Sequence, residues 1–200
     1  VLEMAGITGR QVSHVAISRD PKANIAKKAM FALKKRPDFK LIMDRVKNSA
    51  KVRELHGPLA QALGVPQDDL PKIHFVEHHP SHLASSFFVS PFEHAAVLSV
   101  DGMGDFVSTM WGTGKGNQIT VADSVYFPHS LGFLYTAISQ WLGFTGFGDE
   151  GKVMGLASYG KPTVEGVADL VRLQADGSFE LNLDYFRHEK EGVEMTWAAG

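Results

Sequence analysis

Two histidines four residues apart and a nearby aspartate have the residue types and spacing best suited to chemistry in this chain. His78 and His82 lie in the segment Val-Glu-His-His-Pro-Ser-His-Leu, and Asp101 follows the apolar run Ala-Ala-Val-Leu-Ser-Val. If the segment is helical, side chains four positions apart share one face and can bind a single metal ion. His79 is then a competing ligand or a hydrogen-bond donor behind the ligands. The alternative is that these histidines cap the helix and pack at the edge of the core.

Asp101 also opens the sequence Asp-Gly-Met-Gly-Asp, which ends at Asp105. A carboxylate at the end of a buried strand is costly without a partner, so we expect Asp101 to be paired, hydrogen-bonded or metal-bound. Gly102 and Gly104 allow positive φ and a close approach of the backbone to a phosphate. Because the two carboxylates would repel a bare phosphate, a bridging cation would complete such a site. The plain alternative is a β-hairpin with a glycine-rich turn.

A second candidate for ligand contact is the glycine-rich segment from Gly146 to Gly160. Its glycine density predicts a loop rather than the interior of a helix or strand, and long loops are often functional. Glu150 and Lys152, with Asp149, are candidates for contact with a nucleotide ribose or phosphate. The segment is not a Walker A loop, because its Gly-Lys pair lacks the upstream spacing and the following Ser or Thr. The alternative is a plain loop that carries a solvated charge cluster.

Composition limits the class of protein. The 200 residues have a formal net charge of −2 and contain no cysteine, which excludes disulfide and thiolate chemistry. No stretch approaches the roughly 18 apolar residues of a membrane span. The net charge gives no general electrostatic reason to expect binding to nucleic acid or to an anionic membrane. The chain begins at Val1 and ends in Trp-Ala-Ala-Gly, so we expect a cytoplasmic fragment truncated at both ends.

Strands and helices alternate in the first half of the chain. We expect a strand over 12–18, a helix from Asp20-Pro21 to about Arg36, helical periodicity from Phe39 to Leu63 broken at Gly57-Pro58, and a strand over 72–76. The lysines of the first helix, from Lys22 to Lys35, are assigned to a solvated face rather than to an acidic or RNA partner.

The second half is richer in strands. We expect strands over 95–100, 106–111 and 119–127 with a connection over 112–117, a helix over 131–142 capped by Ser130, a helix over 163–173 and a strand over 179–183. The strand over 95–100 should be buried. The interleaved pattern predicts an α/β class with an antiparallel meander.

Three motifs, in this order, resemble the O-carbamoyltransferase family, which includes enzymes of nodulation-factor and antibiotic biosynthesis. They are Val-Glu-His-His-Pro-Ser-His-Leu-Ala-Ser-Ser-Phe, Leu-Ser-Val-Asp-Gly-Met-Gly-Asp and Gly-Asp-Glu-Gly-Lys-Val-Met-Gly-Leu-Ala-Ser-Tyr-Gly. The likeness runs from the helices after Pro21 to Tyr185-Phe186. One departure is Ala157-Ser158-Tyr159-Gly160, where the family often has Ala-Pro-Tyr-Gly.

The resemblance implies an actin-like, sugar-kinase-like and ribonuclease H-like two-lobed domain, similar to the tRNA threonylcarbamoyl transferase subunit. Residues 1–94 would form the C-terminal part of the first lobe, and residues 95–200 the beginning of the second. By resemblance, His78, His82 and Asp101 bind a divalent ion, often iron. A fourth carboxylate is expected after Gly200 and the family's opening motif before Val1, so the fragment alone is expected to be inactive.

The implied reaction has two steps. Carbamoyl phosphate and ATP give carbamoyladenylate and pyrophosphate in a separate C-terminal domain, and the carbamoyl group then passes to a hydroxyl of a small-molecule acceptor. The metal ion would polarise the carbamoyl carbonyl or neutralise the phosphate. No residue is assigned as the general base. The residues assigned to the nucleotide are Gly102, Gly104, Asp105, Glu150 and Lys152.

Two other functions stay open. One is a tRNA threonylcarbamoyl transferase-like enzyme, in which the basic helix from Lys22 to Arg36 would contact RNA phosphates and tRNA binding would depend steeply on salt. The other is a catalytically silent nucleotide-binding module that acts through a partner domain.

Overall fold

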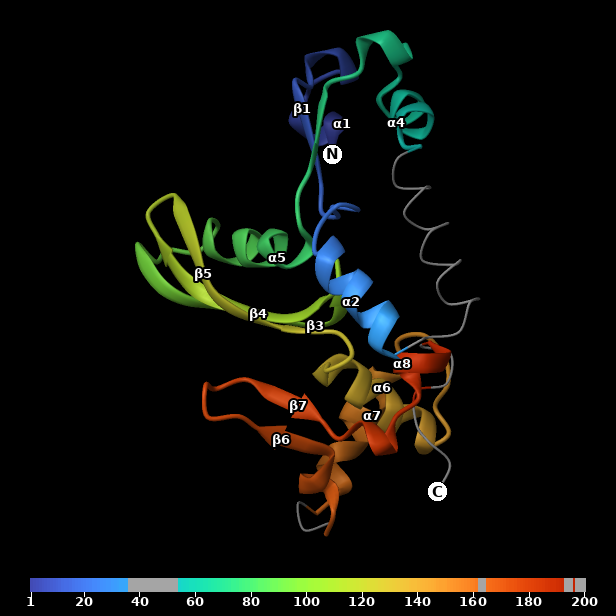
Figure 1. Cartoon of the computed structure of the whole chain (residues 1–200). Helices are drawn as coiled ribbons and strands as arrows, with labels where there is room; N and C mark the ends of the chain where they lie inside the picture. Colours follow the sequence, from blue (N-terminus) through green and yellow to red (C-terminus); the bar gives the residue numbers. More distant parts are fainter. Residues whose placement is uncertain (36–53, 162–164, 193–195, 197–200) are drawn as a thin grey trace.

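The structure is a computed structural model that describes residues 1–35, 54–161, 165–192 and 196 (Figure 1). Its helices are α1 (Leu2–Ala5), α2 (Ile25–Lys35), α4 (His56–Leu63), α5 (His78–Phe87), α6 (Leu131–Trp141), α7 (Glu150–Leu156) and α8 (His188–Glu191). Its strands are β1 (His14–Ile17), β2 (Lys72–Phe75), β3 (His94–Gly104), β4 (Val107–Lys115), β5 (Gln118–Tyr126), β6 (Val171–Leu173) and β7 (Phe179–Leu181). Short 3-10 turns cover Gly9–Gln11, Gln67–Asp69, Ala157–Tyr159, Val167–Leu170 and Leu183–Tyr185.

Strands β1 and β2 confirm the two strands expected in the first half. They pair in parallel, from His14 opposite Lys72 to Ile17 opposite Phe75. The N–H of Val76 still donates to the carbonyl of Ile17 at 2.9 Å, and α5 begins two residues later. The parallel pair therefore brings the start of α5 next to the residues that follow β1.

Helix α2 begins at Ile25, so the expected start after Asp20-Pro21 is wrong. The carboxylate of Asp20 accepts the N–H of Lys22 at 2.8 Å, and Asn24 has a φ of 56°. A short polar side chain that binds nearby backbone in this way competes with helix formation. The helix can therefore start only after this turn.

Two expectations from the first half lie outside the described residues. These are the end of the first helix at Arg36 and the helical periodicity over residues 39–53. Helix α4 begins at His56 and carries Gly57-Pro58 in its first turn, where proline is tolerated because its missing N–H has no helical partner.

Strands β3, β4 and β5 form the antiparallel meander expected from the sequence. The turn between β3 and β4 is shifted from the expected Asp-Gly-Met-Gly-Asp stretch: β3 continues through Gly104, and Asp105 and Phe106 make the turn with φ of 51° and 80°. The expected connection over 112–117 shrinks to Gly116 and Asn117. Two-residue turns with positive φ, here at Asp105 and Phe106 in the first hairpin and at Gly116 in the second, match the twist of the strands that they join.

Helix α5 covers one face of this sheet (Figure 1). The main core cluster joins two side chains of the helix to three of the sheet: Leu83, Phe87, Val97, Val107 and Met110. Strand β3 was expected to be buried, but Leu98 and Val100 are 65% and 49% exposed. Burial therefore alternates along β3, since its side chains point in turn toward α5 and away from it.

Helix α6 matches its expectation most closely. The side chain of Ser130 accepts the N–H of Phe133 at 3.1 Å, and Gly143, just past the end, has a φ of 91°. A second core cluster contains Ala137, Leu181 and Phe186, so α6 packs on the segment around β7.

Two expectations in the last third are wrong. The glycine-rich stretch from Gly146 to Gly160 contains helix α7 and a 3-10 turn, because Val153 is buried and Glu150 is hydrogen-bonded to α6, which overrides the weak helix propensity of glycine. The helix expected over 163–173 is, from 165 onward, a turn, a 3-10 turn and strand β6. That strand pairs with β7, so a hairpin replaces the helix.

The described residues confirm a mixed α/β class with an antiparallel meander. The two-lobed architecture and the division after residue 94 stay predictions; α5, which precedes that division, packs on the sheet that follows it. Among the described helices, none combines the length and the apolar character that crossing a membrane requires.

Candidate metal centre

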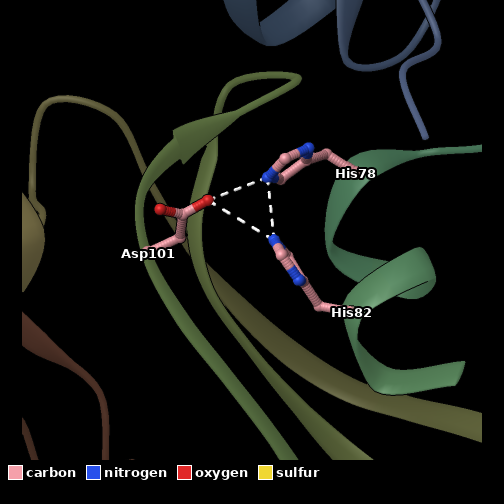
Figure 2. A group of neighbouring side chains, drawn as sticks. All are labelled: His78, His82 and Asp101. Carbon is pink, nitrogen blue, oxygen red and sulfur yellow. Dashed lines mark hydrogen bonds and ion pairs between the residues drawn. The ribbon is translucent and has the colours of Figure 1, made fainter. Parts of the chain in front are cut away.

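The structure brings His78, His82 and Asp101 together (Figure 2). His78 is the first residue of α5 and His82 lies one turn later, while Asp101 is on β3. Because α5 packs on β3, the two imidazoles and the carboxylate point toward one another. Among the described residues, this is the group of histidine, aspartate and glutamate side chains with a geometry suited to a metal ion.

The distances between the three inward atoms fit one ion. His78 Nε2 lies 2.8 Å from Asp101 Oδ2 and 3.0 Å from His82 Nε2, and the third side, from His82 Nε2 to Asp101 Oδ2, is 3.6 Å. A point about 2.1 Å from all three atoms, a normal ligand distance, therefore exists about 1 Å outside their plane. These three atoms could therefore hold one divalent ion together.

The backbone near β1 favours the tautomer of His78 that a metal requires. His78 Nδ1 lies 3.2 Å from the carbonyl oxygen of Ser18, which can only accept a hydrogen bond. If Nδ1 carries the proton, the lone pair of Nε2 points at Asp101 and His82. The lone pair of Nε2 and the oxygen of Asp101 would then face each other, so a cation or an added proton must lie between these groups. A histidine that donates a hydrogen bond from one ring nitrogen and binds a metal ion through the other is the usual arrangement in metal sites.

The carboxyl group of Asp101 is ionised. Partial burial opposes ionisation, but the hydrogen bond from His78, once an added proton lies on its Nε2, and the bond from the N–H of Gly102 hold the pKa of Asp101 below its ordinary value. The Gly102 N–H donates to Asp101 Oδ1 at 2.6 Å, which leaves Oδ2 directed at the histidines. The group therefore contains two imidazoles and one negative charge.

His79 is not part of the candidate centre. Its Nε2–H donates to the carbonyl of Val107 at 2.9 Å, and Nδ1 lies 2.8 Å from the hydroxyl of Ser99. Burial lowers the pKa of His79, so the ring is neutral in the core. Both ring nitrogens are used between α5 and the sheet, which makes this histidine a structural link.

The glycines of the Asp-Gly-Met-Gly-Asp stretch serve close packing. A Cβ at Gly104 would overlap the ring of His78, and a Cβ at Gly132 would lie 2.6 Å from the Cα of Gly102. The hydroxyl of Ser130 donates to the carbonyl of Gly102 at 2.6 Å, which holds α6 against β3. Whether these backbone groups also approach a phosphate stays a prediction.

Asp105 contacts the backbone rather than the candidate centre. Its Oδ2 accepts the N–H of Asp20 at 2.8 Å and the N–H of His78 at 3.0 Å. Its own carbonyl accepts the side-chain amide of Asn24 at 3.1 Å. Sequence reasoning missed these bonds, and no local pattern could have revealed them, since the partners are far apart in the chain.

Glu150 and Lys152 lie on α7, which Figure 1 places beside α6 and apart from α5. Glu150 accepts the hydroxyl of Thr136 at 2.6 Å. Lys152 pairs with Asp149 at 2.6 Å, and the Lys152 side chain is largely exposed. Glu150 thus contacts α6, and Lys152 contacts Asp149, the residue before Glu150. Contact of either side chain with a nucleotide stays a prediction.

Comparison with known proteins identifies relatives of the chain. A Synechocystis protein described as uncharacterized (sll1178) is 49% identical over 130 residues, which are 64% of this chain and 21% of that protein. The nodulation protein NolNO of Sinorhizobium fredii is 44% identical over 108 residues, 54% of this chain and 16% of that protein. The nodulation protein NolO of Bradyrhizobium diazoefficiens is 41% identical over 113 residues, 54% of this chain and 20% of that protein.

The chain spans about a fifth of the length of these relatives. The family model described as the carbamoyltransferase N-terminus matches residues 18–199, which include the whole candidate centre. This match agrees with the three motifs that suggested the same family. The chain belongs to the carbamoyltransferase family and corresponds to its N-terminal part.

Proposed function

We propose that the chain is the metal-binding part of an O-carbamoyltransferase, which moves a carbamoyl group from carbamoyladenylate to a hydroxyl of a small-molecule acceptor. The observation that carries this proposal is the convergence of His78, His82 and Asp101 on one point, in a chain of this family. The adenylate would be made from carbamoyl phosphate and ATP in another domain of the complete protein.

In this proposal, His78 and His82 supply neutral nitrogen ligands and Asp101 supplies an anionic oxygen. A divalent ion bound there, iron by family resemblance, would polarise the carbamoyl carbonyl or offset the negative charge of the adenylate phosphate. The protein would hold the three groups at fixed distances and keep Asp101 ionised, which the hydrogen bond from the N–H of Gly102 to Asp101 Oδ1 supports.

The proposed nucleotide contacts fall into two sets. Gly102 and Gly104 line the end of β3 beside Asp101, so a phosphate held there would lie next to the ion. Glu150 and Lys152 form the second set and would contact the nucleotide from α7, which lies beside α6. Asp105 belongs to the first set, although its carboxylate oxygen already accepts two backbone N–H groups.

The tRNA-enzyme alternative needs the lysines of α2 to face RNA. Lys27 Nζ lies 3.2 Å from the centre of the Tyr126 ring, and Lys35 Nζ lies 2.9 Å from Glu189. Both cations therefore have partners within the protein. We accordingly favour a small-molecule acceptor over tRNA.

The test separates the two half-reactions in the complete protein. Pyrophosphate release from ATP is expected to require carbamoyl phosphate. Asp101→Asn should still release pyrophosphate but lose transfer of labelled carbamoyl to a panel of hydroxyl compounds, because only the second step uses the metal. His94→Ala changes an exposed histidine at the other end of β3 and should keep both steps.

Two outcomes would contradict the proposal. Pyrophosphate release that does not need carbamoyl phosphate would remove carbamoyladenylate as the intermediate. Binding of ATP without any turnover, in the wild type and in Asp101→Asn alike, would favour a nucleotide-binding module instead.

A further inference from the structure

The carboxylate of Asp105 joins three parts of the chain at one oxygen. Oδ2 accepts the N–H of Asp20, 85 positions away, and the N–H of His78, 27 positions away. Asp105 itself lies in the turn between β3 and β4. The turn after β1, the start of α5 and the end of β3 are therefore fixed to one another through this side chain.

The bond to His78 replaces a missing helix cap. The first N–H groups of a helix have no partner inside the helix, and Glu77, at the N-cap of α5, makes no side-chain capping bond. Asp105 accepts the N–H of His78 from the neighbouring hairpin, with a negative charge at the positive end of the helix dipole. The backbone of the first candidate ligand is thus held by a charged group outside its own helix.

The hydrogen bond between Asp20 and Asp105 fixes the segment that makes the second contact of His78, the one with Ser18. The carbonyl of Ser18, which faces His78 Nδ1, lies two residues before Asp20. By binding the N–H of Asp20, Asp105 fixes the segment that carries this carbonyl. Asn24, through its side-chain amide, adds a third bond from the same turn to the backbone of Asp105.

The ring of His78 has little freedom within this frame. Its backbone N–H is bound to Asp105 and its Nδ1 faces Ser18. One side of the ring lies against Gly104, where any Cβ would overlap it. Its remaining nitrogen, Nε2, is then directed at Asp101 and His82.

We propose that Asp105 is a positioning residue for the metal ligand His78: its carboxylate sets both the backbone and the ring of this histidine. The inference deepens the proposed function and rests on it where metal binding is concerned. It gives Asp105 a role that does not require contact with the nucleotide or the ion.

The test uses two substitutions in the complete protein. Asp105→Gly removes the acceptor, while its positive φ of 51° is no strain for glycine. Asp105→Asn keeps an oxygen that can accept both N–H groups and is also tolerated at positive φ. With cobalt(II) as the probe, we expect Asp105→Gly to weaken binding roughly 10- to 100-fold and to shift the visible absorption bands, and Asp105→Asn to restore both.

A matched control and a double variant separate positioning from general loss of structure. Asp176→Gly removes another turn carboxylate that accepts a backbone N–H, in the β6–β7 hairpin, and should leave cobalt binding unchanged. In a His78→Ala background, Asp105→Gly should have no further effect on cobalt affinity, because the two act through one ligand. An equal loss in Asp176→Gly, or a full additional loss in the His78→Ala background, would overturn the inference.

A failure of the metal site itself would look different. If the wild type binds no cobalt, the proposed function fails, and the His78 ring is followed by NMR in metal-free protein with isotope-labelled histidine. A changed His78 ring signal in Asp105→Gly that returns to the wild-type position in Asp105→Asn would still support positioning. Unchanged ring signals in both variants would overturn it.

Discussion

The imidazole of His78 occupies the space in which a side chain at position 104 would lie. A Cβ on Gly104 would overlap the ring, so a histidine in this position requires glycine at position 104. The end of β3 thus presents bare backbone to the first residue of α5. This contact places the ring next to Asp101, three residues before Gly104 on the same strand.

Gly104→Ala is therefore expected to displace His78 and abolish metal binding. The added methyl group should also cost about 1–3 kcal/mol of unfolding free energy, as overpacking does. Cobalt(II) titration and chemical denaturation measure the two effects. Gly151→Ala is the control: its Cβ would meet open space within α7, so it should be neutral or stabilise by about 0.5–1 kcal/mol. Normal metal binding in Gly104→Ala would show that the ring position is not essential.

Asp101→Asn should remove the anionic member of the group that His78, His82 and Asp101 form, with little change of shape. The amide oxygen can still accept the N–H of Gly102, so folding should be preserved. We expect affinity for zinc(II), measured by calorimetry, to fall at least about tenfold because a neutral oxygen is a poorer ligand for a divalent ion. Asp123→Asn, at an exposed position of β5, is the matched substitution and should bind zinc like the wild type.

A structural feature could be predicted from the sequence where the residues that determine it lie close together in the chain. Helix α6 was predicted because Ser130, the apolar spacing and Gly143 all lie within one stretch, and the structure confirms this cap. The spacing of His78 and His82 predicted that the two imidazoles share one helix face, and the resemblance to the family added Asp101 to the set; the structure brings all three together. A helix period was enough for α6 and for the histidine pair, but not for the third member.

The rest depends on contacts between distant segments. The start of α2 was misplaced because Asp20 closes its own turn and is held by Asp105, and nothing near Asp20 in the sequence shows this. Helix α7 was not predicted because glycine has a weak helix propensity. The helix is stabilised by the hydrogen bond from the hydroxyl of Thr136 and by the burial of Val153. Tertiary packing overrides local propensity at such positions.

Ser130→Ala should destabilise the protein by about 0.5–2 kcal/mol, the usual cost of losing an N-cap. The hydroxyl of Ser130 is fully buried, accepts the N–H of Phe133 and donates to the carbonyl of Gly102, so its loss removes one hydrogen bond from each of two backbone groups. Urea denaturation measures the change. Ser158→Ala, whose exposed hydroxyl bonds only within its own turn, should change stability by less than about 0.5 kcal/mol.

Stability should fall as the pH drops through about 6.5 and below, the ordinary pKa of histidine. Burial lowers the pKa of His188 and of His129 in the folded protein. Both rings are neutral in the folded and unfolded chains above that pH; below it the unfolded chain binds protons first, so acid favours unfolding. His188→Gln should show a smaller decrease in denaturation midpoint between about pH 7 and pH 5. An unchanged decrease would show that His188 is not a source of the acid sensitivity.

Two of the candidate ligands come from α5 and the third from β3, so an ion at this point would connect a helix to the sheet beneath it. Ligands that bind only the folded state shift unfolding by mass action, by about 2.7 kcal/mol when their concentration is 100 times the dissociation constant. The attachment of α5 to the sheet would then depend on metal supply as well as on the apolar contacts of Leu83 and Phe87. A chelator added to the complete protein would loosen this helix before it affected the β6–β7 hairpin, which has no part in the centre.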